Sequence, residues 1–213
     1  MTRTIHRISS ALVLISALAL SLQIQSVKAD DQFLLEMEVD KSLVAAGENI
    51  VFTLTLRNVG VENVTLAYGL PLFDLACCAA GGCYRWSDGK YFVFIVLELK
   101  LEIGEDHTEP LEWNLCRYKE GRYVLPEPGK YNLSGVCLHA GAITPNSITI
   151  IVIYSSDLNK DLKVDIQDIT MVAAAYNTRS GDEKWNAITD LDRNGLVNIL
   201  DISMVARDYG KTV

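Results

Sequence analysis

DLNKDLKVDIQDITMVAAAY, at residues 157–176, returns in altered form as DLDRNGLVNILDISMVARDY at residues 190–209. The two copies agree at the opening Asp-Leu pair. They agree again from the eighth position onward, where both contain Val, Ile, Asp-Ile, Met-Val-Ala and a final Tyr. An internal repeat of this kind indicates one supersecondary unit used twice. This repeat therefore organises the C-terminal part of the chain.

Each copy carries oxygen-bearing side chains at positions 1, 3, 5, 9 and 12 of a loop. A backbone carbonyl at position 7 completes the set. Calcium is a hard cation that takes roughly 6–8 oxygen ligands, and this spacing wraps a short loop around one ion. The predicted ligands are Asp157, Asn159, Asp161, Lys163, Asp165 and Asp168 in the first loop, and Asp190, Asp192, Asn194, Leu196, Asn198 and Asp201 in the second.

A helix is expected after each loop, because apolar residues then recur in steps of three and four along residues 166–176. The pattern differs from an EF-hand, since position 12 is Asp instead of Glu and no helical pattern precedes the loop. An alternative interpretation is that Asp- and Asn-rich loops are solvated turns. It explains a single loop better than two loops in register, each followed by the same apolar pattern.

This combination resembles the dockerin module of cellulosomes and related surface assemblies, over residues 157 to about 210. The resemblance implies two Ca²⁺ ions and two loop–helix units packed antiparallel. It also implies a partner, the cohesin domain of a surface or scaffold protein. Positions 10 and 11 of each loop would face that partner, namely Ile166, Gln167, Ile199 and Leu200.

The first loop departs from the dockerin pattern at position 6, where Leu162 stands in place of a glycine. Gly195 keeps the glycine in the second loop. Because this position requires a positive φ, a branched side chain there is strained. We therefore expect the first calcium site to be the weaker one.

Residues 33–154 read as short alternating segments separated by turn signals. Expected strands cover residues 33–39, 49–57, 63–68, 91–103, 108–115, 130–139 and 147–154. About seven strands at this spacing, without a helical pattern, predict an antiparallel immunoglobulin-like β-sandwich. The fold class is therefore an all-β sandwich followed by a small α-helical module with paired calcium loops. The predicted division is 1–29, 30–154 and 155–213.

The block YRWSDGK at residues 84–90, LEIGE at 101–105, LEW at 111–113 and PGKYNLSG at 128–135 resemble the immunoglobulin-like domain of the intracellular proteinase inhibitor family. The resemblance implies the sandwich fold and, by its name, protease inhibition. Because one fold hosts many functions, the resemblance supports the fold more than the activity. The cysteine-rich residues 77–83 interrupt the pattern.

All five cysteines lie in the predicted sandwich. Outside the cytoplasm they are expected to form disulfides. We predict one bridge from Cys83 to Cys77 or Cys78 and another from Cys116 to Cys137. Because five is an odd number, at least one cysteine is then unpaired or linked to another chain. A tetrahedral zinc site is the alternative, although the Cys-Cys doublet lacks the usual ligand spacing.

Residues 1–29 read as a secretory signal peptide, with Arg3 and Arg7 before an apolar run and Val-Lys-Ala at the cleavage site. An uncleaved anchor helix is the alternative, since the run approaches spanning length. Both interpretations place the rest of the chain outside the cytoplasm, as a secreted or cell-surface protein. The formal net charge of -8 and the lack of a basic cluster disfavour a nucleic-acid partner.

Two classes of function fit these patterns. The first is a non-enzymatic, secreted, calcium-dependent adaptor that brings a β-sandwich binding domain to a cohesin-bearing complex, such as one that degrades polysaccharides. The second is a protease inhibitor or small glycan-active enzyme delivered to such a complex. No nucleophile elbow or catalytic-triad pattern is present in the sequence, which favours the non-enzymatic class.

Overall fold

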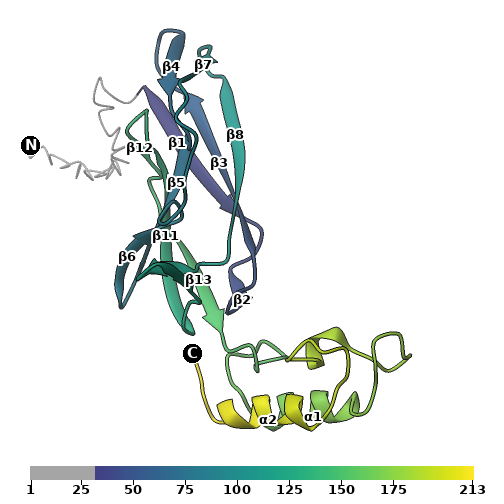
Figure 1. Cartoon of the computed structure of the whole chain (residues 1–213). Helices are drawn as coiled ribbons and strands as arrows, with labels where there is room; N and C mark the ends of the chain where they lie inside the picture. The colour runs from purple at the N-terminus through teal and green to yellow at the C-terminus, as the bar shows by residue number, and fades with distance from the viewer. Residues whose placement is uncertain (1–31) are drawn as a thin grey trace, which may run out of the picture. The chain divides into compact units, whose positions relative to one another are not determined.

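The computed structural model describes residues 32–213 (Figure 1). The predicted signal peptide lies outside the described residues. Within the described part of the chain, no helix is long and apolar enough to cross a membrane.

Two sheets, antiparallel in all but one strand pairing, form most of the N-terminal part. One contains β1 (Phe33–Val39), β3 (Ile50–Asn58) and β8 (Asp106–Trp113), in the order β1-β3-β8. The larger sheet has the order β2-β13-β11-β5-β6, and β12 also pairs with β11. The bounds of its strands are β2 (Leu43–Ala45), β5 (Phe73–Ala79), β6 (Gly82–Arg85), β11 (Gly129–Cys137), β12 (Ala142–Ile143) and β13 (Ile148–Ile153). Only the β2–β13 pairing is parallel.

Two further pairs of strands are shorter. β4 (Val64–Tyr68) pairs with β7 (Leu97–Leu101), and β9 (Arg117–Lys119) pairs with β10 (Arg122–Val124). The core lies between the sheets, because alternate residues of β3 turn inward: Ile50, Phe52, Leu54 and Leu56 are all fully buried. Apolar residues of β5, β11 and β13 pack in the same cluster. This arrangement confirms the predicted all-β sandwich.

The strand prediction for residues 91–103 is wrong in its first half. β7 covers only Leu97–Leu101, and residues 91–96 form no strand. The prediction counted them in an alternating strand, but these six residues are continuously apolar and all six side chains are exposed. The cysteine-rich stretch, which departs from the family's sequence pattern, belongs to the sandwich. It forms the β5–β6 hairpin, with the Cys77 side chain in the core.

One of the two disulfide predictions is confirmed and the other is wrong. Cys78 and Cys83 are bonded, as cross-strand partners of the β5–β6 hairpin. The predicted Cys116–Cys137 bridge is wrong, since both thiols are free. Cys137 lies at the buried end of β11, opposite Phe73 and Ala142, and Cys116 belongs to the loop after β8.

The alternative zinc site is also not supported. Cys77 lies four residues further along β5 than Phe73, the partner of Cys137. A strand rises about 3.3 Å per residue, so these two thiols are held roughly 13 Å apart. Among the described residues, the one group of three metal-ligating acids found is elsewhere, in the second calcium loop.

The C-terminal part contains α1 (Ile166–Ala174), a short 3₁₀ helix η1 (Ala187–Thr189) and α2 (Ile199–Asp208) (Figure 1). Both helices begin where the repeat predicted. A small core joins them, formed by Val164, Val172, Ala175, Val197 and Val205. Trp185, from the connection between the repeats, packs against this core. Two short helices with so few buried residues provide little apolar stabilisation on their own.

Candidate calcium sites

The first position of each loop gathers the backbone of that loop. The Asp157 carboxylate accepts hydrogen bonds from the amides of Asp161 (3.1 Å) and Leu162 (3.0 Å). The Asp190 carboxylate accepts the equivalent pair from Asn194 (3.1 Å) and Gly195 (2.8 Å). The two loops therefore share one backbone conformation, although their sequences differ between positions 3 and 7.

The last position ties the start of each loop to its helix. The fully buried Asp168 accepts from the amides of Leu158 (2.7 Å) and Asp165 (2.8 Å). Its counterpart Asp201 is equally buried and accepts two bonds of 2.8 Å from the matching amides. A buried ionised carboxylate is costly unless it is paired or coordinates a metal ion. Asp168 and Asp201 thus close the loops around a centre lined by oxygen atoms.

Position 9 has a second role that the spacing did not predict. The side chains of Asp165 and Asn198 are the N-caps of α1 and α2, and each accepts a bond of 2.7 Å from a helix amide. In each helix the position-12 carboxylate accepts a hydrogen bond from the N-cap amide, which completes a capping box. Loop and helix are therefore one unit. Position 9 of an EF-hand often contacts calcium through a water molecule, which is compatible with this capping role.

Position 6 has the left-handed backbone that the sequence indicated. Leu162 has φ of 74°, and Gly195 has φ of 82°. Position 4 is left-handed in both loops too, at Lys160 and Arg193. Only position 6 combines a branched residue in one loop with glycine in the other. The backbone is the same, so the first loop bears a strain that the second does not.

The acids of the second loop are the more closely gathered. Carboxylate oxygens of Asp190, Asp192 and Asp201 lie within 4.8 Å of one another. No such trio is found among the acids of the first loop, where position 3 is Asn159. Three converging carboxylates with further carbonyl and amide oxygens nearby form an all-oxygen donor set, which fits Ca²⁺ better than a softer metal ion.

The first loop also shows electrostatic strain. Burial raises the pKa of the Asp157 carboxyl above its ordinary value, and the charges of Asp168 and Asp161 raise it further. Backbone hydrogen bonds from Asp161 and Leu162 oppose this rise without cancelling it. A cation bound between these groups would favour the ionised form. The loop therefore has the electrostatic character of a cation site.

One buried carboxylate of the module is outside both loops and was not singled out by the repeat. Asp208, near the end of α2, accepts bonds from Ser156 (2.9 Å) and Lys211 (2.7 Å) and pairs with Arg207 (3.2 Å). Burial alone would raise its pKa, but these hydrogen bonds outweigh it and lower the pKa to about 2. Asp208 connects the two ends of the module. No pattern signal marked it, because its counterpart in the first copy is Ala175.

The predicted partner contacts are accessible. Ile166, Ile199 and Leu200 are exposed apolar side chains in the first turns of α1 and α2, and Gln167 is exposed beside Ile166. None of the three apolar residues belongs to the core of the module. Exposed apolar residues at the start of each helix are candidates for an interaction surface.

Comparison with known families confirms both resemblances. Residues 37–141 match the family described as intracellular proteinase inhibitor, and residues 155–208 match the dockerin type I domain. The chain thus carries a proteinase-inhibitor-like domain followed by a type I dockerin domain. Dockerin domains of this type bind calcium and dock onto cohesins, and neither matched family is catalytic. No curated protein gives a match to the sequence.

Solved structures show only distant likenesses. A β-glucosidase from Erythrobacter marinus shares 12% identity over 57% of this chain and 15% of its own, with a TM-score of 0.39. An alkylpurine DNA glycosylase from Pseudomonas fluorescens shares 16% over 57% and 30%, with a TM-score of 0.38. A CARDB domain from Pyrococcus furiosus shares 12% over 57% and 87%, with a TM-score of 0.33. Because the chain spans less than a third of the first two proteins and all scores are below 0.5, these likenesses carry no argument.

Proposed function

We propose that this protein is a secreted, calcium-dependent adaptor that docks onto a cohesin-bearing surface or scaffold protein and carries a β-sandwich binding domain to it. The observation that carries the proposal is that the two loops make the same hydrogen bonds. Each loop folds its backbone around a buried carboxylate at position 1 and a second at position 12. The match to the type I dockerin domain supports the same function.

In this proposal the module binds two Ca²⁺ ions. The side chains at positions 1, 3, 5, 9 and 12 and the carbonyls of Lys163 and Leu196 hold the ions. Calcium binding stabilises the folded module and so fixes α1 and α2 in place. The apolar residues Ile166, Ile199 and Leu200, with Gln167, then form the contact with the cohesin.

The test is capture of a cohesin by the purified chain, with and without a calcium chelator. We expect capture in calcium and its loss in chelator. Leu200→Asp should weaken capture because it places a charge in the apolar contact, while calcium affinity stays nearly unchanged. Asp182→Ala, in the connection between the repeats, is the matched control and should leave capture intact. Capture that survives the chelator would contradict the proposal.

A second candidate function has one specific observation in its favour, the family match of residues 37–141. The β-sandwich would then inhibit a proteinase, and the dockerin domain would deliver it to a complex. A panel of extracellular endopeptidases assayed with the full chain tests this. Inhibition in stoichiometric amounts would support the candidate, and no inhibition across the serine, cysteine and metallo classes would speak against it.

The proposal includes the division into residues 30–154 and 155–213. Residues 33–153 have their own apolar cluster, separate from that of the helices. A chain ending at residue 154 should therefore retain the strand-type circular dichroism spectrum and a cooperative melting transition. A soluble but unfolded product would show that the two parts are not independent.

A further inference from the structure

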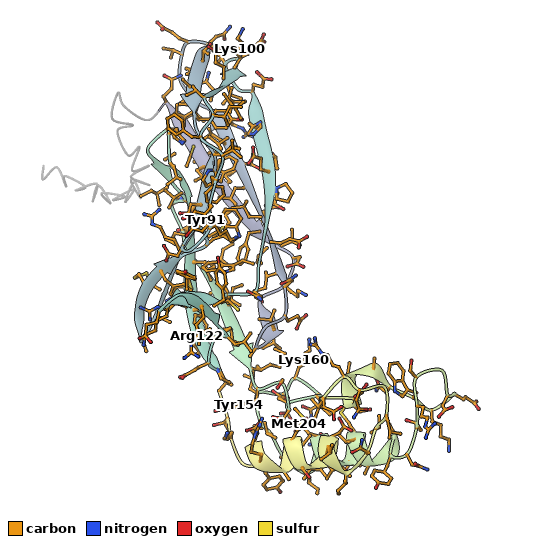
Figure 2. All side chains as sticks on the ribbon, in the orientation of Figure 1. Tyr91, Lys100, Arg122, Tyr154, Lys160 and Met204 are labelled. Carbon is orange, nitrogen blue, oxygen red and sulfur yellow. A yellow bond between two sulfur atoms is a disulfide. The ribbon has the colours of Figure 1, made fainter. Side chains whose placement is uncertain are left out.

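Residues 91–96, with the sequence YFVFIV, form an apolar segment on the surface of the β-sandwich that no function proposed above uses. All six side chains are exposed, Tyr91 at 98% and Phe94 at 100%. Tyr91 is labelled in Figure 2 midway along the sandwich, and Lys100, in β7 beyond the segment, is labelled at its far end. Soluble proteins seldom expose contiguous apolar surface of this kind unless something binds there. This stretch is called the 91–96 segment below.

The backbone of the 91–96 segment is open as well. Within residues 32–213, none of its peptide groups makes a hydrogen bond to another part of the chain. Peptide groups of a strand-like segment that lack partners act as a template for pairing with another chain.

The reason for the missing bonds lies in the neighbouring strand. Pairing between β4 and β7 ends at Tyr68 and Leu97. Beyond this point the amide of Gly69 donates a hydrogen bond to Nε2 of His139 (3.3 Å). Pro71 has no amide hydrogen with which to bond the segment. A hollow of about 450 Å³ lies between residues 67–70 and 92–96. β4 therefore cannot continue along the segment.

The segment is nevertheless held at both ends. At its start, the Lys90 ammonium lies 3.3 Å from the centre of the Trp86 ring, and the Phe92 ring lies 5.9 Å from it. At its end, the chain enters β7, which pairs with β4. Anchoring at both ends reduces the conformational entropy that binding a partner would cost.

We propose that the 91–96 segment is the interface of a homodimer, in which it pairs antiparallel with the same segment of a second copy. The pairing places Phe94 on the two-fold axis, opposite Phe94 of the other copy. Phe92 then faces Val96, and Val93 faces Ile95. Aromatic–aromatic and aromatic–β-branched cross-strand pairs are among those that stabilise antiparallel sheets. A two-fold interface of this kind is the commonest in soluble oligomers.

Charge and area favour a second copy as the occupant. In this register Lys90 of one copy faces Glu98 of the other, so opposite charges meet at both ends and no like charges meet within the apolar run. An aromatic side chain buries roughly 150–250 Å². Three aromatic and three aliphatic residues therefore offer an area close to the ~800 Å² per partner of a standard stable interface.

A dimer would have a consequence for the adaptor. It would contain two dockerin domains, and two linked modules can bind a multi-cohesin scaffold with an avidity roughly 10²–10⁴-fold above that of either one. The dimer itself does not require the proposed cohesin docking, so each can fail without the other.

Sedimentation equilibrium of residues 30–213 tests the dimer. Interfaces of this size usually reach micromolar affinity or better, so we expect dimers at roughly 100 µM. Phe94→Glu should give monomers over the same range, because it places two negative charges at the two-fold axis. The fully exposed Phe94 makes no buried contact, so this variant should fold, as circular dichroism will check.

Two variants serve as matched controls. Val61 is also an exposed apolar residue, at 86%, in the loop between β3 and β4, and Val61→Glu should leave the dimer intact. Leu200→Asp, in the helical module, should leave it intact too. A monomeric wild type at roughly 100 µM overturns the proposal. Dimers that persist in Phe94→Glu, or that dissociate in Leu200→Asp, overturn it equally.

The register has its own test, made in a chain whose partly exposed Cys116 is replaced by Ser. In that chain, Phe94→Cys should form a disulfide-linked dimer on mild oxidation, because the remaining free thiols of Cys77 and Cys137 are buried. Tyr91→Cys should not, because the two copies of residue 91 would be six positions apart, or roughly 20 Å. Disulfides require Cα atoms within roughly 7 Å. Equal cross-linking at both positions would overturn the antiparallel pairing.

Discussion

The two calcium loops share one backbone and differ in the residues placed on it. Residues 157–168 and 190–201 make the same amide-to-carboxylate bonds and the same left-handed turns. The first loop has four carboxylates and a strained Leu162, whereas the second has three carboxylates and Gly195. Only the second brings three carboxylates within 4.8 Å. From this comparison we expect that the arrangement of the acids and the ease of the turn affect calcium affinity more than the number of acids does.

Removal of calcium should have the largest effect, because it acts on both loops at once. A millimolar ion concentration over a micromolar Kd stabilises a folded site by about 4 kcal/mol. Chelation should therefore lower the helix signal and the melting temperature of the module, which circular dichroism at 222 nm measures. The melting transition of the sandwich serves as the internal control and should not move. A module that melts at the same temperature in calcium and in chelator would show that neither loop binds the ion.

Substitution of the aspartate at position 1 should affect the stability of the two loops differently. Asp190→Ala removes one of the three gathered carboxylates and also frees the amides of Asn194 and Gly195. Asp157→Ala removes the same bonds from the loop that is already strained. Both variants lose these hydrogen bonds, which contribute ~1.5–3 kcal/mol each when the acceptor is charged. We expect Asp190→Ala to cost more stability, because the first loop is already strained at Leu162 and so holds its ion less tightly. Calcium titration calorimetry of both variants shows which substitution has the larger effect. Equal losses of calcium binding in the two variants would contradict a difference between the loops.

An exchange at position 6 tests the strain directly. Leu162→Gly should tighten the first site, because a left-handed non-glycine residue costs about 1–2 kcal/mol and glycine does not bear this cost. The greater flexibility of glycine in the unfolded chain will offset part of the gain. The mirror variant Gly195→Leu should weaken the second site, because φ at this position is 82°. Outside the two chain neighbours, no atom lies within 4 Å of the position of an added Cβ. Calorimetry that finds two unchanged sites would contradict the role of strain.

The smallest effect concerns Asp208, which belongs to the second repeat only. Its folded-state pKa, about 2, is below the ordinary 3.8 of an aspartate. The stabilisation is therefore present above about pH 4 and is lost as the pH falls toward 2. Asp208→Asn should cost about 1–2 kcal/mol at pH 7, and the difference from the wild type should shrink in that window. The measurement is chemical denaturation of both chains in calcium between pH 2 and 7. A difference that stays constant across the window would rule out the titration of Asp208 as its source.

Much of the fold was predictable where the residue pattern has a local cause. The alternation in residues 33–39 predicted β1 to its ends, since each side chain of a strand faces the opposite side from the next. Both helices began at the expected residue, because the capping residue and the first helical turn lie within the repeat itself. The spacing also predicts the calcium ligands of both loops, and that assignment stays a prediction.

The sequence by itself determined the two repeated loops, the helices that follow them, the bridge between Cys78 and Cys83 as one of two choices, and the sandwich class. These depend on residues that are close together in the chain. The tertiary structure alone decided which apolar runs are buried. Residues 91–96 look like a core strand, yet β4 turns away to His139 before it can pair with them. It likewise separated Cys116 from Cys137, and it joined Ser156 to Asp208, because contacts between distant residues depend on how whole strands and helices pack.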